Sequence, residues 1–353
     1  MHKGALIYDD YTKLINNKII FSKNFNYKQL QPSSIDLTLS DECYEINSSF
    51  LSSNNKIKNK LNKFLIKKIS LKKGYVFKKN KTYLVRLNEE LKLPKNIFGK
   101  CNPKSSTGRL DIFCRTILDF SNEYEKIPFG YNGEMFIEIT SRAFNIKFHK
   151  GDSLNQMRLV YKKNNLIDDK KLSLYNKDKP IIFCLENKNL STYISNGLKI
   201  TVDLKSNNSI IAYKAKKKSP VLIFNKKNHS IKDFWIPIKN KDDSLTIKPG
   251  QFYILKSKEK IKIPNNMAAE MIPYDTAIGD FRAHYAGFFD PGFGGKLGSH
   301  AVLEVRTNEV SFTLEDGQII ATLLYEYLKK DPKITYGKKI NSNYQNQNLA
   351  LSK

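Results

Sequence analysis

The chain has 353 residues, of which 40% are hydrophobic and 12% aromatic, and its formal net charge is +26. This length allows two domains with ordinary cores, and this composition is typical of a folded rather than a disordered protein. No apolar run approaches the roughly 20 residues of a membrane span, and the N-terminus lacks the apolar region of a signal peptide. We therefore expect a cytoplasmic protein without membrane contact.

The elements predicted along the chain are one short helix, at Asp10–Ile15, followed by many short strands. Runs of β-branched and aromatic residues, bounded by Gly, Pro, Asn and Lys, predict strands. They lie at Ile35–Leu39, Tyr75–Phe77, Tyr83–Leu87, Met135–Ile139, Leu198–Val202, Val221–Phe224 and Ala301–Val305. The polar stretch Lys162–Lys171 is typical of a linker. The pattern predicts a mainly β protein with two barrel-like or jelly-roll-like units.

The two predicted units are copies of one another. Tyr83–Pro103 aligns without a gap with Tyr253–Pro273, and a second match, offset by 166, pairs Glu138 with Glu304. We therefore predict a tandem duplication, with a first β domain at 1–165, a second at 166–328 and a C-terminal tail at 329–353. Where the first copy has Ser105, Ser106 and Arg109, the second has Asp275, Thr276 and Gly279. Only the first copy should bind an anion at this loop.

The positive charge comes mainly from lysines spread along the whole chain. We favour lysine-rich solvated surfaces over a nucleic-acid partner, although a nucleotide triphosphate would also benefit from this charge. The four cysteines form no CxxC pair, and no HxE followed by PCxxC occurs. Structural zinc, a disulfide framework and zinc-dependent deaminase chemistry are therefore not expected.

The loop Lys104–Arg109 places hydroxyls and backbone N–H groups beside glycine and two cations. Such a loop favours a phosphate cradle, although the same string also suits a solvated turn. No GxxxxGK[ST] pattern occurs, and Gly292–Lys296 does not match GxGxxG, so we interpret it as a turn.

Period-two alternation places Phe136 and Glu138 on one face of a predicted strand. Burial among apolar side chains would raise the pKa of this carboxyl into the range of a general acid or base. A structural ion pair is the alternative, and Arg109 is a plausible counter-charge for either role. The residues alone leave both open.

Four segments together resemble the dCTP deaminase branch of the dUTPase-like superfamily, most closely its long, duplicated bacterial form. They are Gln29–Ser40, Cys101–Phe113, Gly130–Ile139 and Asp290–Gly295. The resemblance implies zinc-independent hydrolysis of dCTP to dUTP and ammonia, which supplies dUTP and dUMP for thymidylate synthesis. It also implies Mg²⁺ bound with the triphosphate, dTTP as an inhibitor, and a homotrimer with sites between neighbouring β units.

By the same resemblance, Ser105 and Arg109 match active-site residues and Glu138 matches the catalytic glutamate. Lys104 and Ser106 match phosphate contacts. These five residues lie in the first copy.

The resemblance also reaches the tail, where Tyr336, Tyr344 and Gln347 keep the spacing of a segment that closes over the triphosphate. The aspartate expected at the deoxyribose hydroxyl is missing from the first copy, which has Ile127–Gly130 there, but the second copy retains it as Asp290. Asn343 stands where a tail lysine is expected.

Several alternatives stay open. Glu304 is a second base or a structural carboxylate near Arg306, and we favour the structural role. Asp290, His284 and Arg282 could complete a neighbour's site. A dUTPase or a bifunctional enzyme is the nearest rival, with Asp119 as its water-activating candidate. A non-catalytic nucleotide or nucleic-acid binder is the rival of a different class.

Overall fold

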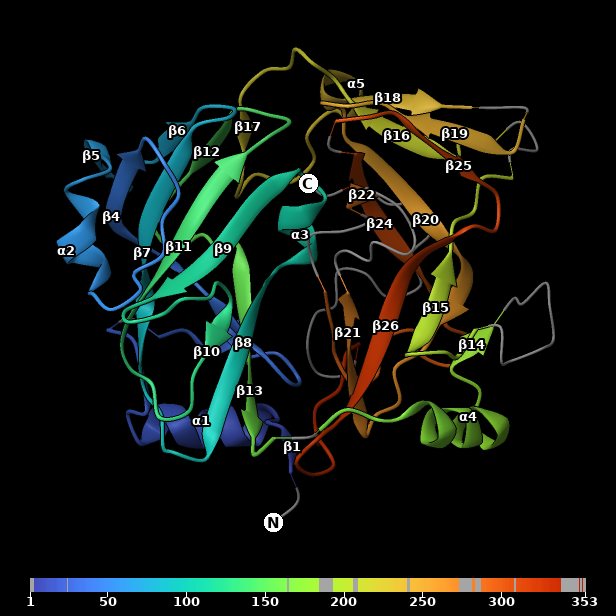
Figure 1. Ribbon diagram of the computed structural model, residues 1–353, viewed down its shortest axis with the longest axis horizontal. Helices are drawn as coiled ribbons and strands as arrows, with labels where there is room; N and C mark the ends of the chain where they lie inside the picture. The colour runs from blue at the N-terminus through green and yellow to red at the C-terminus, as the bar shows by residue number, and fades with distance from the viewer. Residues whose placement is uncertain are drawn as a thin grey trace.

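The computed structural model describes residues 3–23, 25–163, 165–183, 193–205, 209–239, 242–272, 281–282, 287–307, 309–337, 349 and 351. Two β-rich halves lie side by side, the first running from blue to green and the second from yellow to red (Figure 1). The prediction of a mainly β fold is confirmed. No helix in the described part of the chain is both long and apolar enough to cross a membrane.

The first half contains two main sheets. One has the order β1 (Gly4–Ala5), β13 (Asn155–Tyr161), β8 (Ile97–Pro103) and β10 (Lys126–Ile127), with β3 (Ile35–Leu37) also on β13. The other has the order β5 (Leu65–Ser70), β4 (Leu39–Ile46), β7 (Thr82–Lys92), β11 (Asn132–Ser141) and β9 (Ile112–Leu118), with β2 (Ile20–Phe21) on β7. The helices are α1 (Tyr8–Asn16), a 3-10 turn at Tyr27–Gln29, α2 (Ile57–Leu61) and α3 (Ser105–Gly108).

The second half repeats this plan. One sheet has the order β18 (Trp235–Ile238), β16 (Ala212–Ala215), β20 (Tyr253–Ile261), β24 (Ser299–Thr307) and β22 (Phe281–Arg282), with β14 (Ile182–Phe183) on β20. Another has the order β15 (Leu198–Thr201), β26 (Ile319–Tyr327), β21 (Met267–Ile272) and β23 (Phe288–Phe289). The pair β19 (Ser244–Ile247) and β25 (Phe312–Glu315) and the helices α4 (Asp169–Asp178) and α5 (Ile231–Phe234) complete it.

The strand pairings confirm the duplication. The row β7–β11–β9 of the first half corresponds to β20–β24–β22 of the second, and β13–β8–β10 corresponds to β26–β21–β23. Glu138 on β11 and Glu304 on β24 therefore occupy equivalent positions in equivalent sheets. Each half also has its own group of buried apolar residues, for example Val85 and Ile137 in the first and Leu255 and Leu303 in the second.

One segment of the second half completes the core of the first. Strand β17 (Leu222–Ile223) pairs in parallel with β12 (Ile146–Phe148), which in turn pairs with β6 (Tyr75–Phe77). The Phe224 ring lies 5.1 Å from Phe148, and the Trp235 ring lies 5.5 Å from Phe144. Because these aromatic contacts cross from one half to the other, the halves share part of their core.

The predicted linker Lys162–Lys171 is shorter than expected, because its last three residues belong to α4. The side chain of Asp168 accepts the N–H of Lys171 at 2.9 Å and caps this helix. The domain boundary at residue 165 stays a prediction.

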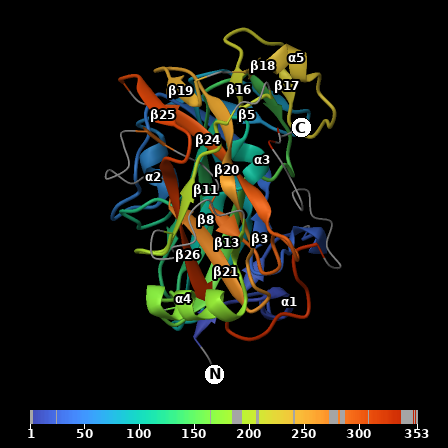
Figure 2. The same ribbon diagram turned by 90° about the vertical axis from the view of Figure 1, so that its right-hand side faces the viewer.

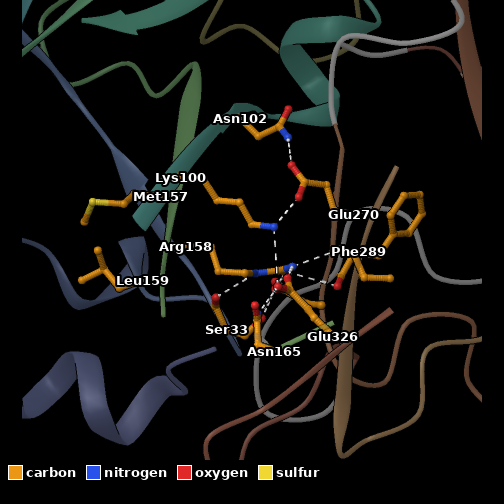
Figure 3. A network of polar contacts seen from close by, with 12 residues as sticks. Ser33, Lys100, Asn102, Met157, Arg158, Leu159, Asn165, Glu270, Phe289 and Glu326 are labelled. Atoms are coloured by element: carbon orange, nitrogen blue, oxygen red, sulfur yellow. Dashed lines mark hydrogen bonds and ion pairs between the residues drawn. The ribbon is translucent and has the colours of Figure 1, made fainter. Parts of the chain in front are cut away.

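A buried network of charges fastens the halves together (Figure 3). Arg158, on β13, has no exposed surface, and its guanidinium contacts Glu326 at 2.5 Å and Asp290 at 3.1 Å. It also donates to the backbone oxygens of Ser33 and Ala269. Burial would raise the pKa of Glu326, but Lys100 and Arg158 outweigh it and lower that pKa. Arg158 thus joins a first-half strand to β21, β26 and the end of β23.

The network includes one pair of equivalent positions. With the offset of 170, Lys100 on β8 aligns with Glu270 on β21, and these two side chains form an ion pair. Asn102 donates a further hydrogen bond to Glu270 at 3.1 Å. The two copies therefore meet through positions that have diverged to opposite charge.

Candidate active site

The predicted anion-binding loop forms a short helix, α3, at the boundary between the halves, beside β22 and β24 (Figure 1). Figure 2 shows the same helix from the side of the second half. Two sets of hydrogen bonds fix its conformation. The N–H groups of Thr107 and Gly108 donate to the carbonyl of Lys104 within the loop. The hydroxyl of Thr107 donates to the carbonyl of Leu154 at 2.8 Å. Thr107 is fully buried, while Ser105 and Ser106 are half-buried. The helix is therefore a fixed platform that leaves two hydroxyls accessible.

The other predicted members of this loop differ in their surroundings. The hydroxyl of Ser105 has no hydrogen-bond partner in the described part of the chain, and Arg109 is only 2% exposed. Lys104 forms an ion pair with Asp36, from the segment Gln29–Ser40. Burial raises the pKa of the Asp36 carboxyl, and Lys104 opposes this shift. A phosphate that binds Lys104 would have to compete with this carboxylate.

The carboxylate that lies against α3 belongs to Glu304 of the second half. A Cβ added to Gly108 would lie 2.7 Å from Cδ and 2.8 Å from Oε1 of Glu304, so an alanine here would force this side chain to shift. Glu304 is 2% exposed. Two residues further along β24, Arg306 forms an ion pair with the buried Asp111, which follows α3. Strand β24 therefore holds a buried carboxylate directly against the predicted anion-binding loop.

Glu138, the sequence-based candidate for the catalytic base, is not brought to this loop. Among the described residues its only hydrogen-bonding partner is Arg115, at 2.7 Å, and its second carboxylate oxygen is buried without a partner. The guanidinium of Arg115 stacks on the ring of Tyr124, 3.6 Å from its centroid. Within this chain, Glu304 rather than Glu138 lies against α3. The sequence-based assignment of Glu138 as the catalytic glutamate stays a prediction.

A sequence signal for Glu304 was available. The intact Asp290-Pro291-Gly292 turn precedes Glu304 in the second copy, whereas the first copy lacks this aspartate ahead of Glu138. The Asp290-Pro291-Gly292 turn and Glu304 therefore lie together in the second copy, whereas α3 lies in the first.

Asp290 lies next to the first half, where it accepts from the hydroxyl of Ser33 at 2.8 Å and pairs with Arg158. The start of the tail rests on the same turn, because the N–H of Tyr336 donates to the carbonyl of Pro291 at 2.7 Å. The Tyr336 ring lies 5.7 Å from Phe293. The turn predicted at Gly292–Lys296 is confirmed, and Tyr336 packs against it.

Some predicted residues lie outside the described part of the chain, and for Arg282 only the backbone, in β22, is described. The residues outside are Cys184, Asp275, Thr276, Gly279, His284, Asn343, Tyr344 and Gln347.

A protein-held metal does not fit the donor set that the described residues offer. No three His, Cys, Asp or Glu side chains in the described ranges gather as metal ligands. Mg²⁺ carried by a triphosphate stays a prediction. Asp119, the candidate of the dUTPase alternative, accepts the N–H of Ile57 at 2.8 Å, at the first turn of α2.

The fold and site together define a duplicated β protein whose hydroxyl-rich, cationic loop faces a buried carboxylate across the boundary between its copies. This is the arrangement of a hydrolase that combines anion binding with proton transfer.

Comparison with known proteins identifies the family. The model of the 2'-deoxycytidine 5'-triphosphate deaminase N-terminal domain matches residues 2–163, and that of the C-terminal domain matches residues 168–353. The chain therefore belongs to the 2'-deoxycytidine 5'-triphosphate deaminase family. It is similar to the crystal structure of 2'-deoxycytidine 5'-triphosphate deaminase from Agrobacterium tumefaciens, with 36% identity, a TM-score of 0.88, and coverage of 94% of this chain and 100% of that one. A search of curated proteins found no match.

Proposed function

We propose that this enzyme hydrolyses dCTP to dUTP and ammonia in one site built from both halves of the chain, with Glu304 as the general base and acid. Membership of the dCTP deaminase family supports the reaction. The packing of Glu304 against Gly108 carries the assignment of the base, because it brings a buried carboxylate to the loop that contains Ser105 and Arg109.

The chemistry requires a base because water is a weak nucleophile toward C4 of cytosine. Glu304 accepts a proton from water as the oxygen bonds to C4. The same proton, and the second proton of the water, then reach the ring nitrogen and the departing amine, so that ammonia leaves and the C4 carbonyl of dUTP forms. General acid–base catalysis of this kind contributes about 10²–10⁴-fold to the rate.

The first half supplies the complementary groups. Ser105 orients the water, and the guanidinium of Arg109 stabilises negative charge in the tetrahedral intermediate. Lys104 and Ser106 bind the phosphates, with Lys104 exchanging its carboxylate partner Asp36 for the ligand. Asp290 holds the deoxyribose hydroxyl, and the tail that begins at Tyr336 covers the triphosphate with Tyr344 and Gln347.

A matched pair of variants tests the assignment. Glu304→Gln should lower kcat for dUTP and ammonia formation by about 10²–10⁴-fold with little change in dCTP binding, because the amide keeps the shape of the side chain but cannot accept the proton. Glu138→Gln should retain turnover. Both products are measured by chromatography and an ammonia assay. Full activity of Glu304→Gln, or loss of activity in Glu138→Gln alone, would falsify the choice of base.

The same incubation separates the rivals. Diphosphate and dUMP among the products would indicate a dUTPase or a bifunctional enzyme. Binding of DNA with a steep salt dependence and no ammonia release would favour a nucleic-acid binder. The homotrimer, dTTP inhibition, the Mg²⁺ requirement and the cytoplasmic location stay predictions from the family resemblance. Sedimentation tests the homotrimer, and inhibition kinetics test the effect of dTTP. Chelation tests the Mg²⁺ requirement, and cell fractionation tests the location.

A further inference from the structure

A hollow lies between the halves, and its lining differs from the groups assigned to deamination. Its volume is about 430 Å³, within the range of about 300–1,000 Å³ that small-molecule sites span. Seven of its lining residues are basic: Lys79 and Arg142 of the first half, and Lys214, Lys216–Lys218 and Arg306 of the second. We call it the basic pocket. Neither Lys104–Arg109 nor Glu304 lines it.

The charge of the basic pocket is largely uncompensated. No carboxylate is among its lining residues. In the described part of the chain, no ion pair joins Lys79, Arg142 or Lys214 to an acid, and the same holds for Lys217 and Lys218; Arg306 has its partner in Asp111. Like charges held together in a partly desolvated hollow repel one another. A multivalent anion would remove this repulsion, which a single carboxylate or chloride could do only in part.

The remaining lining narrows the class of ligand. Ala143, Ala215 and Phe252 give the hollow an apolar side, and Ile236 is 40% exposed beside it. Cations on one side and apolar groups on the other suit a chain of phosphates, with room for an attached base or sugar. We propose that the basic pocket binds a polyphosphate anion, either inorganic or carried by a nucleoside.

The pocket is connected to α3 by a short chain of contacts. Arg306 lines the pocket and pairs with Asp111. The N–H of Arg142 donates to the carbonyl of Asp111 at 3.0 Å, and the N–H of Asp111 donates to the carbonyl of Gly108 at 2.9 Å. Asp111 has a φ of +56°, in a region that non-glycine residues rarely adopt. An anion that attracts Arg142 and Arg306 therefore acts on Asp111, two residues after the loop Lys104–Arg109.

This coupling, which rests on the proposed function, predicts that polyphosphate in the pocket changes kcat. Glu304 lies two residues before Arg306 on β24, so both walls of the proposed active site adjoin the pocket. The binding proposal itself does not depend on deamination, and the two are tested by separate readouts.

The binding test is calorimetric titration of the full chain with inorganic triphosphate. The wild type should bind two equivalents, one at the active site and one in the basic pocket. Lys214→Gln/Lys217→Gln should weaken one of them by at least about tenfold, because each charged hydrogen bond contributes about 1.5–3 kcal/mol and 1.4 kcal/mol is tenfold. The control Lys226→Gln/Lys227→Gln removes the same charge from exposed positions outside the pocket and should bind as the wild type does.

Two outcomes would overturn the binding proposal: a pocket variant that binds triphosphate like the wild type, or a control variant that loses the same equivalent. Titration with a nucleoside triphosphate distinguishes the sources, since tighter binding than inorganic triphosphate indicates that the base or sugar is recognised. Single-stranded DNA that binds in place of triphosphate, and is lost in both double variants, would instead assign the charge to nucleic acid.

The kinetic test compares the three proteins at saturating dCTP, at which competition for the active site disappears. Because dCTP carries a triphosphate that can itself occupy the basic pocket, kcat of Lys214→Gln/Lys217→Gln should differ from kcat of the wild type and of the control variant, with or without added triphosphate. Equal kcat values for all three proteins contradict the coupling. Absence of any deamination contradicts the proposed function but does not affect the interpretation of the calorimetric titration.

Discussion

Replacing Arg158 by methionine should strongly destabilise the contact between the two halves. Methionine fills similar space without charge, so the variant removes the cation and little volume. It leaves Glu326, about 1% exposed, and Asp290, about 9% exposed at the side chain, without their guanidinium partner. Removing one partner of a buried ion pair costs about 3–5 kcal/mol, a large part of the about 5–15 kcal/mol that stabilises an ordinary domain.

The assay is urea unfolding followed through Trp235, the only tryptophan of the chain. Trp235 is 4% exposed and lies where β17 and β18 meet the first half, between Phe144 and Phe252. Its emission therefore reports separation of the halves. A matched control is Lys126→Met, which removes the partner of Glu123 in a pair exposed by 66% and 59%, where about 0–1 kcal/mol is expected.

Two results would refute this reasoning. The first is that Arg158→Met lowers the free energy of unfolding no more than the surface control Lys126→Met does. The second is that the double variant Arg158→Met/Glu326→Gln is no more stable than Arg158→Met alone. The double variant should recover part of the loss, because without Arg158 the buried Glu326 keeps only Lys100, 3.5 Å away, as a cationic partner among the described residues.

Two further predictions concern the catalytic loop and a buried acid. Gly108→Ala should lower kcat about 10²-fold, because its Cβ would displace the proposed base Glu304 and a displacement of about 1 Å can cost that much. Unchanged steady-state kinetics would contradict the packing. Burial raises the pKa of the Glu125 carboxyl from 4.5 to about 7, against hydrogen bonds from Thr116 and Asn155. The unfolded chain then releases this proton first, so stability should fall as pH rises from 4.5 to 7. Glu125→Gln should make the free energy of unfolding depend less on pH between 4.5 and 7 and should add at most about 3 kcal/mol to it at pH 8. Identical pH profiles of urea unfolding for the variant and the wild type would exclude this role of Glu125.

Local patterns predicted the strands and the duplication. Period-two alternation placed Ile137 and Ile139 on a buried face, and both belong to the first core. The helix predicted at Asp10–Ile15 lies within α1. These features depend on neighbours in the sequence or on a constant offset, so the sequence alone contains them.

The carboxylate that lies against the loop Lys104–Arg109 could not be predicted in this way. Glu138 and Glu304 have equivalent positions on equivalent strands, and neither strand pattern indicates which one faces α3. That depends on how the halves dock, through contacts such as Arg158 with Glu326, separated by 168 residues. The crossing of β17 onto β12 is also invisible in local periodicity. Docking contacts of this kind join residues that no short-range pattern connects.

The pairing of Lys100 with Glu270 explains why the docking favours two different halves over two equal ones. If both copies were identical, this contact would bring lysine against lysine, and like charges about 4 Å apart repel by about 4 kcal/mol at an effective dielectric constant of 20. The diverged copies attract instead. The same divergence gives the first half Ser105 and Arg109 and the second half Asp290, while both halves keep the glutamate, as Glu138 and Glu304. The Lys100–Glu270 contact favours the docking of two different halves, and the proposed active site needs groups from both of them. Neither half alone should therefore deaminate dCTP.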